Sequence, residues 1–388
     1  MAYIEGNQKG EVNAMKNNSA LQSILQAYVD QGEIAGIALR VRFRDEIVFD
    51  DSYGYADIEM KRKVSKDTIF RLASMTKPII AIGIMILVEE GKLRLDDPLS
   101  SYLSSYSNMH VEGSNHDCGK PITIRTMLNH SSGMGERPGS SEKIMEIFEQ
   151  PDTLEKRVEK LSGIELDFEP GTDTGYSALW AYEVLGRIIE IVSELELDTF
   201  LRKKIFEPLG ITDIIYTLTE EQVSRMAKLY EYNNGSLLDV TQSDVMWKSI
   251  THYKNYYSGT AGLKGSIAAY DQFVRMLFGK GSVEGKQIVS KQSMSELLRN
   301  SGPADKFIAD GIYWGLGMIV FGKREETGRF VGEGSFGWSG AYGTHFYVDP
   351  AHELQMVLMV NRSNIGGADS YISKELERYV YRTFVKEI

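Results

Sequence analysis

The chain has a single cysteine, six histidines and no long apolar run, and each of these shortages excludes a class of protein. One cysteine, Cys118, allows no internal disulfide. His116 and Cys118 could together bind a metal ion in the polar stretch 113–120, but two ligands do not make a metal site. No apolar run approaches the roughly 20 residues that span a bilayer. We therefore expect no metal, no cofactor and no membrane-spanning helix.

The chain also lacks an excess of positive charge. Its 43 lysines and arginines face 54 aspartates and glutamates, which gives a formal net charge of −11. A strongly negative protein repels nucleic acid and anionic lipid, so we expect neither nucleic acid nor a membrane as a partner. The first ten residues contain no apolar segment of the kind that directs secretion, which predicts a cytoplasmic protein.

The stretch that carries the most chemical information is residues 68–90. The polar tetrad Ser-Met-Thr-Lys at 74–77 precedes a proline and then ten mostly large apolar residues, a run that predicts a buried helix. Pro78 is tolerated only in a first turn, so the helix should begin near Ser74. Residues three apart share a helix face, which would place Lys77 beside Ser74. A desolvated, neutral lysine amine there could accept the serine proton.

Spacing alone does not establish a catalytic serine. The pattern Ser-x-x-Lys occurs again from Ser140 to Lys143, where it follows Arg-Pro-Gly and opens a helix with a polar face. We interpret Ser140 or Ser141 as the N-cap of that helix. Ser74 could also be a cap, with Lys77 as a solvated surface lysine, and spacing alone favours that interpretation. The other motifs decide between the two.

The order of the predicted elements indicates an α+β fold. Residues 19–31 repeat apolar side chains at helical spacing, and two β-rich runs, 34–43 and 46–55, would form a hairpin through Arg44-Asp45. Helices are predicted through the middle of the chain, over residues 123–130, 141–160, 177–194, 197–206, 267–278 and 291–298. Strands are predicted near the C-terminus, over residues 314–321, 329–333, 343–348 and 354–360, before a last helix at 370–385.

Strands at both ends of the chain imply one antiparallel sheet built from the N- and C-terminal segments and flanked by helices. We expect residues 19–95 and 311–388 to form this sheet subdomain and residues 96–310 to form a mostly helical one. The active site would lie at their junction. Residues 212–260 are irregular and rich in tyrosine, and we expect them to line the substrate cleft.

A serine hydrolase also needs a second acid–base group and two donors for the oxyanion. Tyr176 follows the turn Glu-Pro-Gly-Thr and precedes an amphipathic helix, so its hydroxyl can point out of the fold. Tyr232 and Tyr253 each begin a looser Tyr-x-Asn pattern and are the alternatives. The glycine-rich stretch 334–346 would let a backbone pass close to the serine, although a hairpin turn explains these glycines equally well.

Together these motifs resemble the serine β-lactamase and penicillin-binding-protein superfamily, and in particular its class C β-lactamases and family VIII carboxylesterases. The resemblance covers about residues 20–385 and implies a β-lactamase/transpeptidase-like fold. Phe-Arg-Leu-Ala-Ser-Met-Thr-Lys, ending at Lys77, is similar to the nucleophile motif and implies Ser74 as nucleophile and Lys77 as its activating base. Pro-Gly-Thr-Asp-Thr-Gly-Tyr is similar to the tyrosine motif and implies Tyr176 as general acid and base. His130, in Leu-Asn-His-Ser-Ser-Gly, is implied to be structural.

The sequence Trp-Ser-Gly-Ala at 338–341 resembles the strand motif of the same superfamily. There the residue after the glycine supplies the second oxyanion N–H. The resemblance therefore implies an oxyanion hole formed by the backbone N–H groups of Ser74 and Ala341. It also implies that substrate is bound along this strand, by Trp338, Ser339, Gly340 and Tyr342.

Two departures from the peptidase and lactamase pattern concern the substrate. The asparagine two residues after the tyrosine is replaced by Ala178, and the lysine or histidine before Ser-Gly is replaced by Trp338. That cation anchors a substrate carboxylate, and an ion-assisted hydrogen bond is worth roughly 1.5–3 kcal/mol. We therefore expect a serine hydrolase that forms an acyl-enzyme on small uncharged esters or amides. The alternatives are a β-lactamase or D-amino-acid-specific peptidase, and a non-catalytic binding protein with the same fold.

Overall fold

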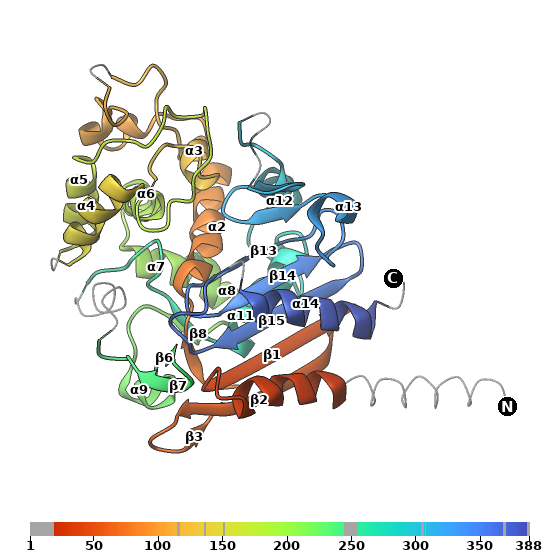
Figure 1. The fold of residues 1–388 in the computed structure, drawn as a ribbon. Coiled ribbons are helices and arrows are strands. Elements are labelled where there is room, and N and C mark those ends of the chain that lie inside the picture. Colours follow the sequence, from red (N-terminus) through yellow and green to blue (C-terminus); the bar gives the residue numbers. More distant parts are fainter. Residues whose placement is uncertain are drawn as a thin grey trace.

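Figure 1 shows the computed structural model, which describes residues 19–114, 117–135, 137–149, 152–243, 255–303, 306, 308–367 and 370–385. Its centre is an eight-stranded antiparallel sheet in the order β11-β12-β13-β14-β15-β1-β2-β3. Strand β1 (Gly36–Phe43) pairs with β15 (Leu354–Val360), so the N- and C-terminal segments lie side by side in one sheet. The predicted α+β fold, with an antiparallel sheet built from both ends of the chain, is confirmed.

The other strands of this sheet are short, apart from β2. They are β2 (Glu46–Asp57), β3 (Arg62–Lys63), β11 (Ile312–Trp314), β12 (Ile319–Phe321), β13 (Phe336–Ser339) and β14 (His345–Asp349). A small sheet joins β4 (Ile69–Arg71), β8 (Lys264–Ser266) and β5 (Ile214–Ile215). Two separate hairpins are β6 (Tyr230–Asn233) with β7 (Ser236–Asp239), and β9 (Ser282–Val283) with β10 (Lys286–Gln287).

Residues 19–30 are helical, and most of the other helices lie between β4 and β11. These are α2 (Thr76–Glu89), α3 (Ile124–Leu128), α4 (Pro138–Phe148), α5 (Leu154–Leu161), α6 (Ala181–Ser193), α7 (Leu197–Leu201), α8 (Glu207–Leu209), α9 (Glu220–Arg225), α11 (Ile267–Phe278) and α12 (Lys291–Leu298). The C-terminal segment adds α13 (Arg324–Thr327) and α14 (Tyr371–Phe384). No described helix is long and apolar enough to cross a membrane.

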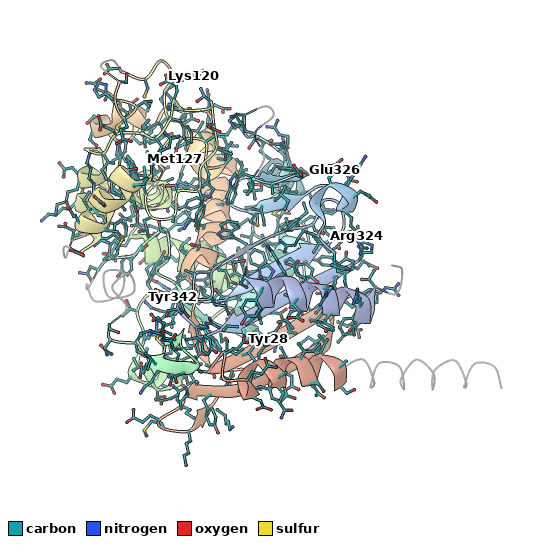
Figure 2. All side chains as sticks on the ribbon, in the orientation of Figure 1. Tyr28, Lys120, Met127, Arg324, Glu326 and Tyr342 are labelled. Carbon is teal, nitrogen blue, oxygen red and sulfur yellow. The ribbon has the colours of Figure 1, made fainter. Side chains whose placement is uncertain are left out.

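The two faces of the sheet carry different helices. Successive side chains of a strand point to opposite faces. His345 of β14 lies 3.0 Å from Glu377 of α14, whereas the ring of the next residue, Phe346, packs against Tyr270 of α11. Figure 1 shows α14 and the N-terminal helix on one side of the sheet, and Tyr28 of that helix, labelled in Figure 2, makes an edge contact with Tyr371 at the start of α14.

Helix α2 runs between the sheet and the helical part of the molecule (Figure 1). Its residues from Thr76 to Leu87 are all buried, which explains why the run of large apolar residues in the sequence has no polar side. The helix starts at Thr76, with Pro78 in its first turn, close to the start predicted near Ser74. Ser74 therefore lies two residues before the buried first turn of α2.

Several local predictions were accurate. The β1–β2 hairpin turns through Arg44 and Asp45, both at positive φ, as the twist of a tight hairpin requires. Strand β15 covers the residues predicted. The last helix and the helices α11 and α12 match their predicted ranges to within a residue.

Other local predictions were wrong. The run 314–321 is not one strand but the hairpin β11–β12, which reverses at Gly317, where φ is +92°. Residues 329–333 form no strand, and residues 141–160 contain two helices, α4 and α5, in place of one. Neither Ser140 nor Ser141 is an N-cap, because α4 begins with Pro138 after the cap residue Arg137. Proline fits the first turn without losing a hydrogen bond, so the helix starts earlier than the serines suggest.

The division into a sheet subdomain (19–95 and 311–388) and a helical subdomain (96–310) stays a prediction. The structure adds one fact that bears on it. Helix α11, which lies inside the predicted helical part, contacts β1, β14 and β15 and so belongs to the core of the sheet.

Candidate active site

Ser74 lies on a tight 3₁₀ turn, Ala73–Met75, between β4 and α2. Ala73, the residue before it, has a φ of +46°, a conformation that a residue with a Cβ adopts only at a cost. The turn is held from outside by a hydrogen bond from the Thr344 hydroxyl to the Leu72 carbonyl. This constrained backbone carries the Ser74 side chain to the wall of a cavity.

Lys77 is fully buried directly behind Ser74. Its Nζ lies 3.1 Å from Ser74 Oγ, 2.9 Å from the Ala178 carbonyl and 3.2 Å from the Thr260 carbonyl. The two carbonyls accept two N–H bonds, and the third position of the nitrogen faces Ser74. In a neutral amine that position is a lone pair that can accept the serine proton, and in an ammonium it is a third donor. The contact predicted from the Ser-x-x-Lys spacing is therefore present.

Tyr176 lies on the other side of the serine. Its hydroxyl donates to Ser74 Oγ at 2.8 Å. The ring stacks on Trp314 with centroids 5.7 Å apart and planes 9° apart, and it also contacts Trp338. Lys77 Nζ lies 5.2 Å from the centre of the ring, so a positive charge on the lysine is attracted to the electron-rich face of the tyrosine. Ser74 Oγ is thus within hydrogen-bonding distance of two groups that can take or return its proton.

His130 is buried against these groups but does not reach Ser74 by any described contact. Its Nδ1 accepts from the backbone N–H of Ser177, and its ring packs on Tyr176 and Trp314. Burial, together with the charge of Lys77, holds the pKa of His130 well below 6.5, so the ring is neutral. The arrangement agrees with the structural role that the resemblance implies.

A second buried group, Glu183 of α6, stabilises the loop behind Lys77. Its carboxylate accepts from the Tyr256 hydroxyl at 2.8 Å, from the backbone N–H of Thr260 at 3.2 Å, and from the Ser258 hydroxyl. Burial raises the pKa of Glu183 more than these bonds and the Arg157 charge lower it. The Thr260 carbonyl accepts from Lys77. By binding the N–H of the same residue, Glu183 fixes the position of one hydrogen-bond partner of the lysine. No pattern in the sequence points to Glu183, because it lies in an ordinary amphipathic helix.

The cavity in front of Ser74 has a volume of about 460 Å³, within the range of small-molecule sites. Its walls are mostly apolar. It is lined by Ala73, Ser74, Tyr176, Ala178, Leu179, Ala261, Ile308, Ala309, Ile312, Trp314, Ile319, Arg329, Trp338, Ser339, Ala341 and Gly367. The structure therefore brings Ser74 and Tyr176 together with three of the predicted strand residues, Trp338, Ser339 and Ala341.

Gly340 and Tyr342 are placed differently from the other predicted substrate contacts. Neither is among the residues that line the cavity. A Cβ on Gly340 would lie 2.3 Å from the Leu72 carbonyl oxygen, so the glycine is needed where the end of β13 crosses the Ser74 turn. Tyr342, labelled in Figure 2, packs with Ala73 and Leu229 behind that turn. Gly340 and Tyr342 therefore hold the end of β13 against the turn that carries Ser74.

The wall formed by residues 308–319 and the contribution of Arg329 are not predicted from the sequence. The strand predicted over 314–321 begins at Trp314, but the chain reverses at Gly317, which turns β11 toward the cavity. Residues 212–260 had been expected to line the cleft, but none of their described members does so. Residues 244–254, including the alternative Tyr253, lie outside the described residues. Tyr232, the other alternative, is on the β6–β7 hairpin, where its ring packs under Arg362.

The remaining candidates do not gather into a site. The Ser140 hydroxyl lies 2.8 Å from Asp167 Oδ1 and 3.1 Å from the Arg137 carbonyl oxygen, so the serine of the second Ser-x-x-Lys copy has structural partners. Cys118 is half-buried in its loop, and His116 lies outside the described residues. Within the described part of the chain, no three histidine, cysteine, aspartate or glutamate residues are grouped so that they could hold a metal ion.

The sequence of this chain is similar to those of several known proteins. The Beta-lactamase family model matches residues 21–374. Esterase EstB of Burkholderia gladioli is 27% identical over 378 residues, which cover 90% of this chain and 92% of the esterase. Penicillin-binding protein 4* of Bacillus subtilis (strain 168) is 27% identical over 381 residues, which cover 95% of this chain and 77% of that protein.

A solved structure described as EstCE1, a hydrolase with promiscuous acyltransferase activity, has the same fold. It superposes with a TM-score of 0.80 and 23% sequence identity, and the match covers 96% of this chain and 99% of that one.

Proposed function

Since the chain belongs to the Beta-lactamase family, we propose that it is a serine hydrolase in which Ser74 forms an acyl-enzyme with small uncharged esters or amides. One observation carries the proposal. Ser74 Oγ lies between Lys77 Nζ, at 3.1 Å, and the Tyr176 hydroxyl, at 2.8 Å, at the wall of an apolar cavity. A serine hydroxyl becomes a useful nucleophile when a base is within hydrogen-bonding distance, and here two such groups are.

The reaction follows from these contacts. Ser74 Oγ attacks the carbonyl carbon while its proton passes to the Lys77–Tyr176 pair. Tyr176, which faces the cavity, returns a proton to the leaving alcohol or amine as the carbon–leaving-group bond breaks. Water then attacks the acyl carbon and gives a proton to the same pair, which returns it to Ser74 Oγ as the bond between Oγ and the acyl carbon breaks and the acid leaves. The backbone N–H groups of Ser74 and Ala341 stabilise the oxyanion in both steps.

The shape and charge of the cavity support an uncharged substrate. Trp338 occupies the position of the cation that other family branches use, and its indole contacts Trp314 and Tyr176. Three aromatic rings around the reacting carbonyl favour an apolar acyl or alcohol group and provide no cation for a carboxylate. The cavity does contain Arg329, but Glu377 pairs with it through both carboxylate oxygens, which neutralises its charge.

The test is turnover of p-nitrophenyl butyrate and of nitrocefin by the wild type, Ser74→Ala and Ser140→Ala. We expect the ester to be cleaved faster than nitrocefin, and cleavage to be lost in Ser74→Ala. Ser140→Ala changes the serine of the other Ser-x-x-Lys copy and is the matched control, which should retain activity. A Ser74→Ala protein that turns over the ester like the wild type would refute the proposal.

Two alternatives make different predictions. A β-lactamase or D-amino-acid-specific peptidase would turn over nitrocefin or a D-Ala-ended peptide faster than the ester. A non-catalytic binding protein would form no covalent adduct on Ser74 with a serine-directed phosphonate, by mass spectrometry. The cytoplasmic location and the absence of nucleic-acid partners are further proposals from the sequence, which cell fractionation and a nucleic-acid binding assay would test.

A further inference from the structure

A chain of four polar side chains runs under the cavity and reaches it at both ends. Arg329 and Ser339 line the cavity. Arg329 donates to both oxygens of Glu377, His345 Nε2 lies 3.0 Å from Glu377 Oε1, and His345 Nδ1 lies 2.7 Å from Ser339 Oγ. The side chains of His345 and Glu377 are only 4% and 2% exposed. The reaction described above uses neither of them.

The sheet register builds this chain. Ser339 on β13 and His345 on β14 are directly opposite each other in the antiparallel ladder, so their side chains lie on the same face. That face is covered by α14, which carries Glu377. Arg329 arrives from the connection between α13 and β13 and pairs with Glu377, its guanidinium also lying over the ring of Phe321. Ser339, His345 and Glu377 are thus held by β13, β14 and α14, which also form the core of the sheet.

The charges in the chain determine the direction of its hydrogen bonds. Burial alone would raise the pKa of Glu377, but the neighbouring His345, with Nε2 3.0 Å away, and the paired Arg329 outweigh burial and lower the pKa. Glu377 is therefore an ionised carboxylate, which only accepts, so His345 Nε2 carries the hydrogen. Arg329 already balances the charge of Glu377, and a second buried cation would have no counter-charge. With the hydrogen on Nε2, the Nδ1 of His345 is the acceptor that faces Ser339 Oγ at 2.7 Å.

The consequence appears at Ser339. If Nδ1 of His345 accepts, the Ser339 O–H must donate to it. The hydrogen of Ser339 then points away from the substrate, and what the oxygen offers to the cavity is a lone pair. In the absence of His345 the same hydroxyl could rotate and donate to a substrate oxygen.

We propose that Arg329, Glu377 and His345 fix the Ser339 hydroxyl as a hydrogen-bond acceptor in the cavity, so that the enzyme prefers esters or amides whose acyl part carries an O–H or N–H donor. His345 and Glu377 act as positioning residues, and Ser339 is the group that touches the substrate. The inference rests on the proposed function, because it concerns the substrate of the Ser74 reaction. It adds a polar specificity element to a cavity that is otherwise mostly apolar.

A pair of substrates isolates the donor. The p-nitrophenyl esters of 3-hydroxybutyrate and 3-methoxybutyrate share a leaving group and an ether or hydroxyl oxygen, but only the first can donate. We expect the wild type to favour the hydroxy ester in kcat/KM by roughly 3- to 10-fold, the range for one neutral hydrogen bond. Ser339→Ala and His345→Phe should bring this ratio down toward that of the uncatalysed reaction, and Ser339→Thr, which keeps the hydroxyl, should retain it.

Because the ratio compares the two substrates within one variant, a loss of folded protein or of acylation rate that affects both substrates equally cancels. A wild-type ratio that Ser339→Ala leaves unchanged would overturn the inference, as would an acyl adduct found on Ser339, which would make this serine a nucleophile. Turnover of p-nitrophenyl butyrate, measured beside the pair, separates the two levels. Ser74-dependent cleavage of butyrate without a donor preference rejects only this inference, whereas no Ser74-dependent cleavage of any ester rejects the proposed function and the inference with it.

Discussion

The buried carboxylate of Glu183 offers a prediction whose size can be worked out from its contacts. Three donors converge on it from the segment 256–260: the hydroxyls of Tyr256 and Ser258 and the backbone N–H of Thr260. The Thr260 carbonyl is in turn a partner of Lys77. We expect Glu183→Ala to lower both the stability of the fold and the rate of acylation.

The expected loss of stability follows from the donors left behind. Each buried donor that loses its acceptor costs about 1–3 kcal/mol, and removing the carboxylate recovers part of the cost of burying it, so we expect a loss of about 3–5 kcal/mol for the three donors. For 388 residues, an unfolding entropy of about 2.1 cal/mol/K per residue gives roughly 0.8 kcal/mol/K. The melting temperature should therefore fall by about 4–6 °C.

Glu183→Gln is the matched control. Its amide oxygen can take the place of Oε1 and keep the bonds from Ser258 and Thr260, while its NH2 group donates to the Tyr256 oxygen. The Tyr256 O–H loses its acceptor while the other two donors keep theirs, so we expect about 1–2 kcal/mol. Urea denaturation measures both variants, and ester turnover well below the melting temperature should fall more in Ala than in Gln. An alanine variant within about 1 kcal/mol of the wild type, with unchanged kcat, would refute the reasoning.

Three further predictions test other parts of the site. Trp338→His restores a group that can carry positive charge, and we expect it to raise the rate on nitrocefin relative to p-nitrophenyl butyrate by about tenfold, the effect of one ion-assisted hydrogen bond; an unchanged ratio would show that the tryptophan does not set this preference. The pKa of buried His130 is well below 6.5, so as the pH falls the unfolded chain binds a proton at this histidine before the folded chain does. The free energy of unfolding should therefore decrease below about pH 6.5, by up to 1.36 kcal/mol per pH unit more than in His130→Asn. Equal slopes in the two proteins would contradict this. Dialysis against EDTA should leave ester turnover unchanged, since every step runs through protein side chains, and activity that returns only with an added divalent metal would show otherwise.

The elements that could be predicted from the sequence are those whose pattern is local. The β1–β2 hairpin was visible because Arg44-Asp45 separates two β-rich runs, and α2 because its apolar run is too long for a strand. The Ser74–Lys77 contact follows from the same helix, since the pair is separated by less than one turn and no distant residue is needed to bring them together. The α+β architecture was also readable, because strands and helices are segregated along the chain.

Predictions failed where a backbone reversal or a distant partner decided the outcome. The strand expected over 314–321 is a hairpin because Gly317 adopts a positive φ. Glycine allows φ of either sign, so its presence in an apolar run does not show which conformation it adopts. The strand expected over 329–333 is irregular, since Arg329 leaves the sheet direction to pair with Glu377 of α14. Ser140 resembled a cap because the sequence does not show that Asp167 accepts its hydroxyl.

The sequence by itself determined the chemical groups of the site: a serine and a lysine three residues apart at the start of a helix, a tyrosine ahead of another, and a tryptophan where a cation would bind a carboxylate. Only the tertiary structure decided which groups surround them. Glu183 and His345 look like ordinary helix and strand residues, and what they do depends on Thr260, Ser339 and Glu377, residues that reach them through packing. A side chain's type is written in the sequence, whereas its hydrogen-bond direction depends on neighbours that only the folded chain supplies.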